Sequence, residues 1–187
     1  HRMECVSTDG KLIWAFTAGG RISSPPVIHQ GMCIFGCHDG RVYAVRISDG
    51  TLAWRFLAAP ARRKIVAYGQ LESSWPVYGV VMHRGKVCAS AGRHPEIGGG
   101  IYVYGLEVDS GRMAWKRVLS KSPAQINGTD RTSRRIVPNS ALNDVLRSDG
   151  KLLSLPGHRG ADFVFDPEMT DEQLSEKLNT APPKKRR

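Results

Sequence analysis

The sequence lacks a long apolar run. No segment of its 187 residues approaches the ~18 consecutive apolar residues that a membrane-spanning helix requires. The N-terminus, HRMECVSTDG, has no apolar core of the kind found in secretory signal peptides, so no signal peptide is visible in this chain. Because the sequence opens in the middle of a repeated pattern, we expect it to be part of a longer protein.

Cysteines are few, and their spacing does not suit a zinc ribbon. The chain has four cysteines, Cys5, Cys33, Cys37 and Cys88, and no Cys-x-x-Cys pair. On a strand, Cys33 and Cys37 would share one face but lie about 13 Å apart, which is too far for a disulfide. We therefore expect buried, free cysteines, and the redox compartment stays open.

Acidic residues are outnumbered. The chain has 17 Asp and Glu against 27 Lys and Arg, which gives a formal net charge of +10. Several basic residues form runs, at 62–64, 134–135 and 184–187. This balance favours an acidic partner. The alternative is a solvated basic surface that ends in a charged tail.

Aromatic residues make up only 7% of the chain, and three of the four tryptophans recur in one pattern. The segments STDGKLIWAF (7–16), ISDGTLAWRF (47–56) and VDSGRMAWKR (108–117) each place a tryptophan four residues after a glycine. The glycine–tryptophan pairs are Gly10 with Trp14, Gly50 with Trp54, and Gly111 with Trp115. Large apolar residues alternate along each segment, which predicts strands. Asp-Gly before two of these strands predicts type I′ hairpin turns.

The flanking sequence extends the repeat to four strands. SSPPVI (23–28) matches SSWPVY (73–78), and a short strand pattern follows each. We expect one unit with strands at 24–29, 32–37, 41–47 and 51–57, and a second at 74–82, 86–91, 101–107 and 112–118. Four strands repeated at about 40 residues is the period of β-propeller blades.

These units predict an all-β fold, a partial β-propeller of four-stranded antiparallel blades. We count about three blade equivalents in an open arc: a closing hairpin at 1–17, full blades at 22–57 and 73–118, and a partial blade at 142–155. The remaining blades would come from the parent chain or from another copy. Residues 156–187 should form a polar tail, with a short helix at 171–179 after a Thr170–Gln173 capping box and a disordered basic end.

Antiparallel order assigns the connections to two faces. The Asp-Gly turns and the HQG and HRG turns (29–31 and 83–85) must lie on one face of the blades. The longer connections at 37–40, 57–72, 92–100 and 120–138 must lie on the other, which we call the loop face. Functional residues often lie in long loops on a rigid scaffold, so we predict the loop face as the binding surface. Its candidate residues are His38, Asp39, Arg62, Arg63, Lys64, Arg93, His94, Arg134 and Arg135.

Other chemistry is less well supported by the residues. His38-Asp39 could act as a general base with its orienting carboxylate, although a simple turn also accounts for the pair. His94 and Glu96 have no third metal ligand in view, so we expect no metal site. The aromatic residues are used in the repeated strands and leave no stacking platform, which argues against a nucleic-acid partner.

The repeated segments resemble the tryptophan-docking motif of pyrroloquinoline-quinone-like (PQQ-like) propeller repeats, Ala-x-Asp-x-x-Thr-Gly-x-x-x-Trp. Ala44, Gly50 and Trp54 match this motif, as do Gly111 and Trp115. The departures are Arg46 and Glu107 at the Asp position and Gly105 at the Ala position. The resemblance covers about residues 4–118 and is similar to bacterial, planctomycete-type repeat proteins and to outer-membrane assembly lipoprotein B.

The resemblance implies a quinoprotein alcohol dehydrogenase-like fold and leaves two functions open. Dehydrogenases of the family bind PQQ and calcium and commonly carry two adjacent cysteines, whereas other members bind proteins without a cofactor. This sequence has no adjacent cysteines and no matching set of calcium carboxylates. We therefore expect no cofactor and a non-enzymatic interaction scaffold of the bacterial cell envelope or periplasm. The alternatives are a fragment of a PQQ-dependent quinoprotein oxidoreductase and a degenerate remnant without a ligand.

Overall fold

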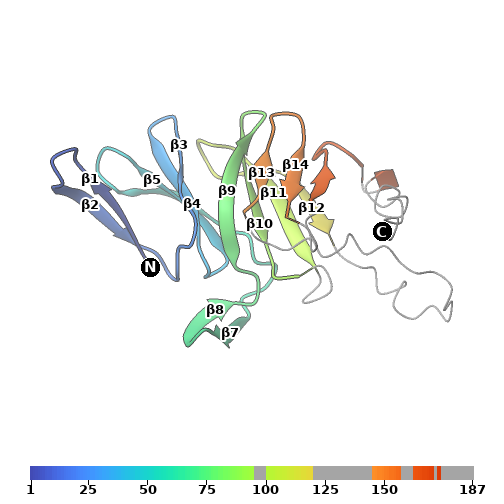
Figure 1. Cartoon of the computed structure of the whole chain (residues 1–187), viewed down its shortest axis with the longest axis horizontal. Coiled ribbons are helices and arrows are strands. Elements are labelled where there is room, and N and C mark those ends of the chain that lie inside the picture. The colour runs from blue at the N-terminus through green and yellow to red at the C-terminus, as the bar shows by residue number, and fades with distance from the viewer. Residues whose placement is uncertain (95–99, 120–144, 157–161, 171, 174–187) are drawn as a thin grey trace, which may run out of the picture.

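The computed structural model describes residues 1–94, 100–119, 145–156, 162–170 and 172–173. In this part of the chain every regular element longer than one turn is a β-strand (Figure 1). The strands are β1 (Arg2–Val6), β2 (Leu12–Thr17), β3 (Val27–His29), β4 (Met32–Gly36), β5 (Arg41–Arg46), β6 (Leu52–Leu57), β7 (Lys64–Ala67), β8 (Gln70–Ser73), β9 (Val77–His83), β10 (Lys86–Ala91), β11 (Ile101–Leu106), β12 (Met113–Leu119), β13 (Arg147–Ser148), β14 (Leu153–Leu155) and β15 (Phe163–Phe165).

The strands form antiparallel sheets that follow one another in chain order. β1 pairs with β2, β3 to β6 form a four-stranded sheet, β9 to β12 form a second, and β13 to β15 form a third sheet of three strands. Figure 1 shows these sheets side by side, as neighbouring blades of a propeller lie. The all-β class and the partial propeller predicted from the sequence are confirmed.

The turns differ from the prediction in one respect. Positive φ at both central residues, typical of a type I′ turn, occurs at Gln30-Gly31, Arg84-Gly85 and Tyr68-Gly69. Before the tryptophan strands only the glycine has positive φ, and the Gly50 amide donates to the Arg46 carbonyl at 2.9 Å. The longer turn at 47–51 is stabilised by the Asp49 carboxylate, which accepts the Thr51 amide and hydroxyl. The type I′ prediction for the Asp-Gly turns was therefore wrong.

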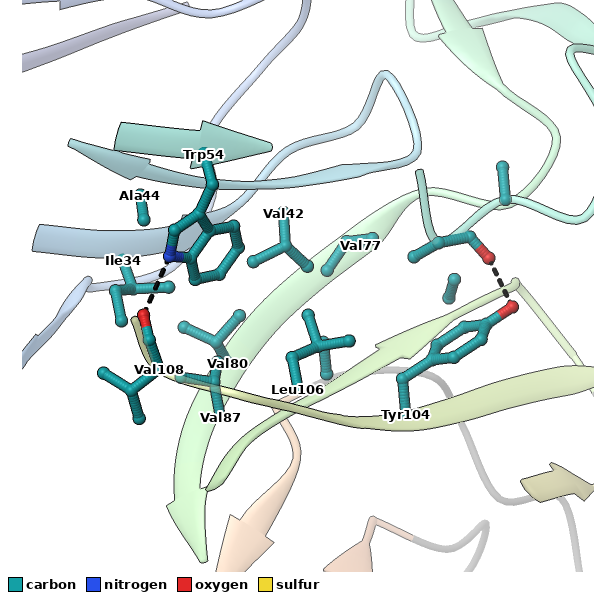
Figure 2. Packing of buried hydrophobic residues seen from close by; sticks show 14 of the residues in the cluster. Ile34, Val42, Ala44, Trp54, Val77, Val80, Val87, Tyr104, Leu106 and Val108 are labelled. Carbon is teal, nitrogen blue, oxygen red and sulfur yellow. Dashed lines mark hydrogen bonds between the residues drawn. The ribbon is translucent and has the colours of Figure 1, made fainter. Parts of the chain in front are cut away.

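Two of the repeated indoles lie against the neighbouring sheet. The Trp14 indole donates to the Ile47 carbonyl at 2.6 Å, and Trp54 donates to the Val108 carbonyl at 2.8 Å. Each ring covers the glycine of the next sheet's turn so closely that a Cβ on Gly50 or Gly111 would meet it at 2.6 or 2.4 Å. Figure 2 shows Trp54 crossing from its own sheet to Val108. The same tryptophan position thus joins successive sheets.

Trp115 occupies the corresponding strand position in the second four-stranded sheet. It pairs with Gly105, is half-buried, and packs against the cluster between this sheet and the third one. A Cβ on Gly105 would lie 2.2 Å from the indole. The glycine at the motif's alanine position therefore makes room for this ring.

Each junction between sheets has its own hydrophobic cluster. Ile34, Val42 and Trp54 of one sheet pack against the next, to which Val80 and Leu106 belong (Figure 2). A second cluster joins β1–β2 to the first four-stranded sheet, and a third joins β9–β12 to β13–β15. Because the core is divided in this way, each sheet is stabilised mainly by its immediate neighbours.

The third sheet corrects two expectations. The Ser148 Oγ at the end of β13 lies 2.8 Å from His83 Nδ1 at the end of β9. This hydrogen bond places β13 beside β9, the first strand of the preceding sheet. Asp149-Gly150 therefore joins the first two strands of a blade, a position where the repeat carries no tryptophan. β15 pairs with β14, so the polar tail does not begin at residue 156. The reason is the apolar run Phe163–Phe165, which favours a strand and whose last residue is fully buried.

Smaller expectations also have outcomes. The four cysteines are free, as predicted. Cys33, Cys37 and Cys88 are also buried, but Cys5 is only partly buried, contrary to the prediction. The connection at 57–72 contains the β7–β8 hairpin, which we had expected to be a loop. Thr170 and Gln173 form the reciprocal bonds of a capping box, at 2.9 and 3.2 Å. The rest of the helix predicted at 171–179 lies outside the described residues.

Candidate binding face

The two faces predicted from strand order are present. The Ile47 amide donates to the Gly31 carbonyl at 2.9 Å, so the short turns of a sheet lie together. At the other end of the strands the Ala58 amide donates to the Gly40 carbonyl, also at 2.9 Å. Figure 1 shows the β7–β8 hairpin projecting from this second end, away from the short turns. This end is the loop face.

A pocket of about 240 Å³ opens on the loop face where the β7–β8 connection leaves the first four-stranded sheet. We call it the basic pocket. Its charged lining consists of Asp39, Arg41, Arg62, Arg63 and Lys64. Leu57, Ala59, Ala61 and Ser73 complete the wall. A predicted basic run and a predicted turn residue thus meet in one concave site.

Three of the four cations of the basic pocket have no ion-pair partner among the described residues that line it. Asp39 is occupied by its own neighbours: it accepts the Arg41 amide at 3.0 Å, the Arg41 guanidinium at 3.3 Å and the Tyr43 hydroxyl. Among the residues that the structure describes, the exposed side chains of Arg62, Arg63 and Lys64 form no ion pair. The pocket therefore presents three available cations to an anionic group.

The hairpin beside the pocket presents apolar side chains to solvent. Val66 is 77% exposed, Tyr68 84% and Leu71 58%. Arg21 lies 5.3 Å from the centre of the Tyr68 ring, a cation–π distance that supports the hairpin tip from the side. The hairpin thus places exposed apolar side chains next to the cations of the basic pocket. This combination suits a partner that offers both carboxylates and an apolar group.

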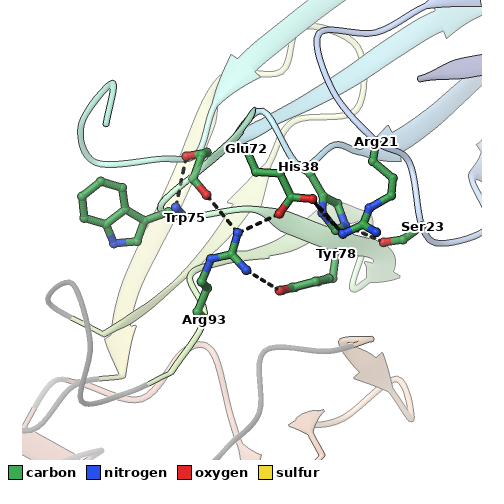
Figure 3. A network of polar contacts seen from close by, with 8 residues as sticks. Arg21, Ser23, His38, Glu72, Trp75, Tyr78 and Arg93 are labelled. Carbon is green, nitrogen blue, oxygen red and sulfur yellow. Dashed lines mark hydrogen bonds and ion pairs between the residues drawn. The ribbon is translucent and has the colours of Figure 1, made fainter. Parts of the chain in front are cut away.

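A buried polar network lies under the same face (Figure 3). The Glu72 side chain is 1% exposed and accepts bonds from three groups: Arg21 at 2.7 Å, Arg93 at 2.7 Å and His38 Nδ1 at 3.0 Å. Arg93 also donates to the Ser73 carbonyl at 3.3 Å. The network links the connection before β3, the turn after β4, strand β8 and the loop after β10.

The network also sets protonation states. Burial raises the pKa of the Glu72 carboxyl, but the hydrogen bonds from Arg93 and His38 and the nearby positive charges outweigh it, so the pKa falls below its usual value. Burial lowers the pKa of His38, and the two arginines lower it further against the opposing effect of Glu72. Near neutral pH the site therefore holds a carboxylate, two guanidinium groups and a neutral imidazole.

Residues 2–160 match the family described as outer membrane protein assembly factor BamB. The chain belongs to this family. The match confirms the resemblance to PQQ-like repeats and reaches beyond residues 4–118, on which that resemblance rested. No curated protein sequence matches the chain.

Solved structures of low sequence identity share the fold. Quinohemoprotein alcohol dehydrogenase ADHIIG from Pseudomonas putida HK5 has a TM-score of 0.58 and 16% identity, over 81% of this chain and 25% of that one. BamB from Moraxella catarrhalis has a TM-score of 0.48 and 14% identity, over 83% of this chain and 37% of that one. Quinohemoprotein alcohol dehydrogenase from Comamonas testosteroni has a TM-score of 0.50 and 16% identity, over 63% and 18%. The chain thus spans less than two-fifths of the length of these proteins, and the likeness shows the fold alone.

In this BamB-family chain the predicted site residues fall into three groups. Arg62, Arg63, Lys64 and Asp39 line the basic pocket. Arg93 and His38 belong to the buried network instead, because Glu72 draws them inward. His94 follows Arg93 in the same loop. Arg134 and Arg135 lie outside the described residues.

Sequence reasoning missed the centre of the network. Glu72 lies in the connection at 57–72 but is not among the predicted site residues, and no pattern in the sequence singles out Arg21 as its partner. The partners of Glu72 are distant in the sequence: Arg21 is 51 positions away and His38 is 34. The one relevant pattern is the repeat of SSPPVI (23–28) and SSWPVY (73–78), which indicates that the residues leading into β3 and β9 share a structural role.

Among the described residues, no helix is long and apolar enough to cross a membrane. The same residues contain no group of three or more His, Cys, Asp or Glu side chains placed to hold a metal ion.

Proposed function

We propose that this chain is part of an interaction scaffold of the bacterial cell envelope, with the loop face as its protein-binding surface. The BamB-family match supports an assembly role at the envelope or periplasm. The observation that carries the proposal is the basic pocket, which has three exposed cations without ion-pair partners among the described residues and lies beside an exposed apolar hairpin.

The pocket indicates the chemistry of the partner. Arginine can donate two parallel hydrogen bonds to one carboxylate, so Arg62 and Arg63 suit an acidic peptide segment. Tyr68 and Val66 would contact apolar residues next to those carboxylates. The proposed partner is therefore a protein segment with acidic and apolar residues close together, bound without a cofactor.

The oxidoreductase alternative rests on the dehydrogenase folds among the structural neighbours. A calcium and quinone site needs a cluster of oxygen ligands. Among the described residues no such cluster of carboxylates is present, and no two cysteines are adjacent in the sequence. The described residues therefore offer no carboxylate cluster in support of this alternative.

Charge reversal tests the binding proposal. We expect the double variant Arg62→Glu and Arg63→Glu to bind a fluorescein-labelled poly-glutamate peptide at least about tenfold more weakly at ~0.1 M salt, because attraction becomes repulsion at the pocket. Fluorescence anisotropy measures the dissociation constant.

The matched control changes the same net charge on the opposite face. Lys11 and Arg112 lie in the short turns, with side chains 83% and 77% exposed. The variant Lys11→Glu and Arg112→Glu should bind the peptide almost as tightly as the unmodified chain. Equal weakening in both double variants would mean that only the overall basic charge attracts the peptide, and the proposed site would be rejected.

A further inference from the structure

Three residues of the buried network are arranged in a chain that the scaffold role does not use. The Ser23 hydroxyl lies 2.8 Å from His38 Nε2, and His38 Nδ1 lies 3.0 Å from Glu72 Oε1 (Figure 3). Ser23 is exposed, whereas the side chains of His38 and Glu72 are 2% and 1% exposed. Serine nucleophiles show the same order: an accessible hydroxyl, then a histidine base, then a carboxylate that orients the histidine.

The electrostatics assign the protons in this chain. Nδ1 also has the Arg21 guanidinium at 3.3 Å, but the carboxylate is nearer, and a lone pair facing it would be repelled. Nδ1–H therefore donates to Glu72, and the Nε2 lone pair is left to accept the Ser23 proton. The pKa of His38, lowered mainly by burial, keeps the imidazole neutral and able to act as a base.

Several contacts hold the base and its carboxylate still. The Tyr78 ring meets the imidazole edge-on, with centroids 4.9 Å apart and planes at 78°. Arg93 binds the second oxygen of Glu72 at 2.7 Å, which fixes the carboxylate plane. Orientation of this kind is what a general base requires before its pKa matters.

The chemistry at the surface also suggests a substrate class. Ser24, next to Ser23 in the chain, lines a pocket of about 350 Å³ whose walls are mostly apolar but include Arg147 and Ser148. Ser23 itself does not line this pocket, and its exposed hydroxyl is within reach of the carbonyl of a small ester without an acyl-binding cavity.

We propose that Ser23 is an activated nucleophile that accepts acyl groups from small apolar esters, with His38 as general base and Glu72 as its positioning residue. The Ser23 oxygen bonds to the ester carbonyl carbon while its proton passes to His38 Nε2. The carbon–oxygen bond to the leaving alcohol then breaks, and that alcohol takes the proton from Nε2. Water hydrolyses the acyl-serine by the same route in reverse, which releases the acid and restores the Ser23 hydroxyl.

A fluorophosphonate probe tests this activity separately from peptide binding. The probe forms a phosphorus–oxygen bond to an activated serine and releases fluoride. We expect an adduct on the Ser23 peptide by mass spectrometry, with a labelling rate at least about 100-fold lower for Ser23→Ala. Ser110→Ala, which removes another exposed serine, should label like the unmodified chain. The proposal is overturned if no adduct forms, if Ser23→Ala labels equally, or if urea-unfolded chain labels as fast.

The pH dependence gives a second readout that a structural hydrogen bond would not produce. Labelling should fall only below about pH 6.5, where His38 begins to gain a proton, and should be level above it. Because the pKa of His38 is lowered, its imidazole is neutral and able to act as a base at neutral and alkaline pH. A rate that climbs steadily into the alkaline range would indicate an ordinary serine hydroxyl and overturn the assignment. Hydrolysis of p-nitrophenyl acetate should follow the same profile.

Discussion

Gly111→Ala is expected to lower the free energy of unfolding by about 4 kcal/mol, the largest loss among the turn glycines. Two costs add at this position. Its φ of +65° is a left-handed conformation that costs alanine about 1 kcal/mol more than glycine. The new Cβ would also lie 2.4 Å from the Trp54 ring, so the indole must leave its place against the neighbouring sheet. Displacing it breaks the Trp54–Val108 hydrogen bond and opens the cluster beneath.

Gly10 separates these two costs. It holds the same position in the first turn, with φ of +83°, but a Cβ there would meet nothing within 4 Å. Gly10→Ala should therefore lose only about 1 kcal/mol, from backbone strain alone. Urea unfolding followed by tryptophan fluorescence measures both variants. Similar losses for the two would show that indole docking contributes nothing to the junction between sheets.

The fold could be inferred from the sequence because its signals are local. The apolar alternation around Trp54 and the glycine four residues earlier both lie within one blade, and the same pattern recurs in the next. The third sheet was harder, since Asp149-Gly150 looks like the turn before a tryptophan strand but joins two earlier strands of the blade. Its assignment depends on the contact between Ser148 and His83, 65 residues away, which no local pattern contains.

The same distinction explains the site. Arg62, Arg63 and Lys64 are consecutive, so their shared position on the loop face could be read from the order of the strands. The inward direction of Arg93 and His38 could not, because it depends on Glu72, whose burial follows from the pairing of β7 with β8. A charged residue in a loop was thus predicted at the surface when it is a partner in a buried network.

Glu72→Gln should cost about 3 kcal/mol at pH 7, because the change leaves two partly buried guanidinium groups without their counter-charge. Arg21 and Arg93 each lie 2.7 Å from a different Glu72 oxygen, and an amide can accept from only one of them. The neutral His38 would also lose the charge that orients its ring. Chemical denaturation at fixed pH measures the loss.

The pH dependence of this loss supplies a further check. The pKa of Glu72 is lowered in the folded chain, so the unfolded chain binds the proton first as the pH falls. The stabilisation from the carboxylate is therefore complete above about pH 4.5 and is lost progressively below it. The difference in unfolding free energy between the unmodified chain and Glu72→Gln should shrink in that acidic range. The lowered pKa of His38 makes the unmodified chain itself less stable as the pH falls below about 6.5, because the unfolded chain then binds the proton first.

Glu107→Gln is the matched control for the loss of a paired carboxylate. Glu107 binds Lys86 at 2.7 Å, but the two side chains are 25% and 35% exposed, so water replaces much of the lost interaction. That variant should lose less than about 1 kcal/mol. If Glu72→Gln proves no more costly than Glu107→Gln, or if its loss is the same at pH 7 and pH 4, Glu72 is not the charged centre of the network. The general-base role of His38 would then lack its orienting carboxylate as well, so one set of unfolding curves bears on both the stability and the chemistry of this face.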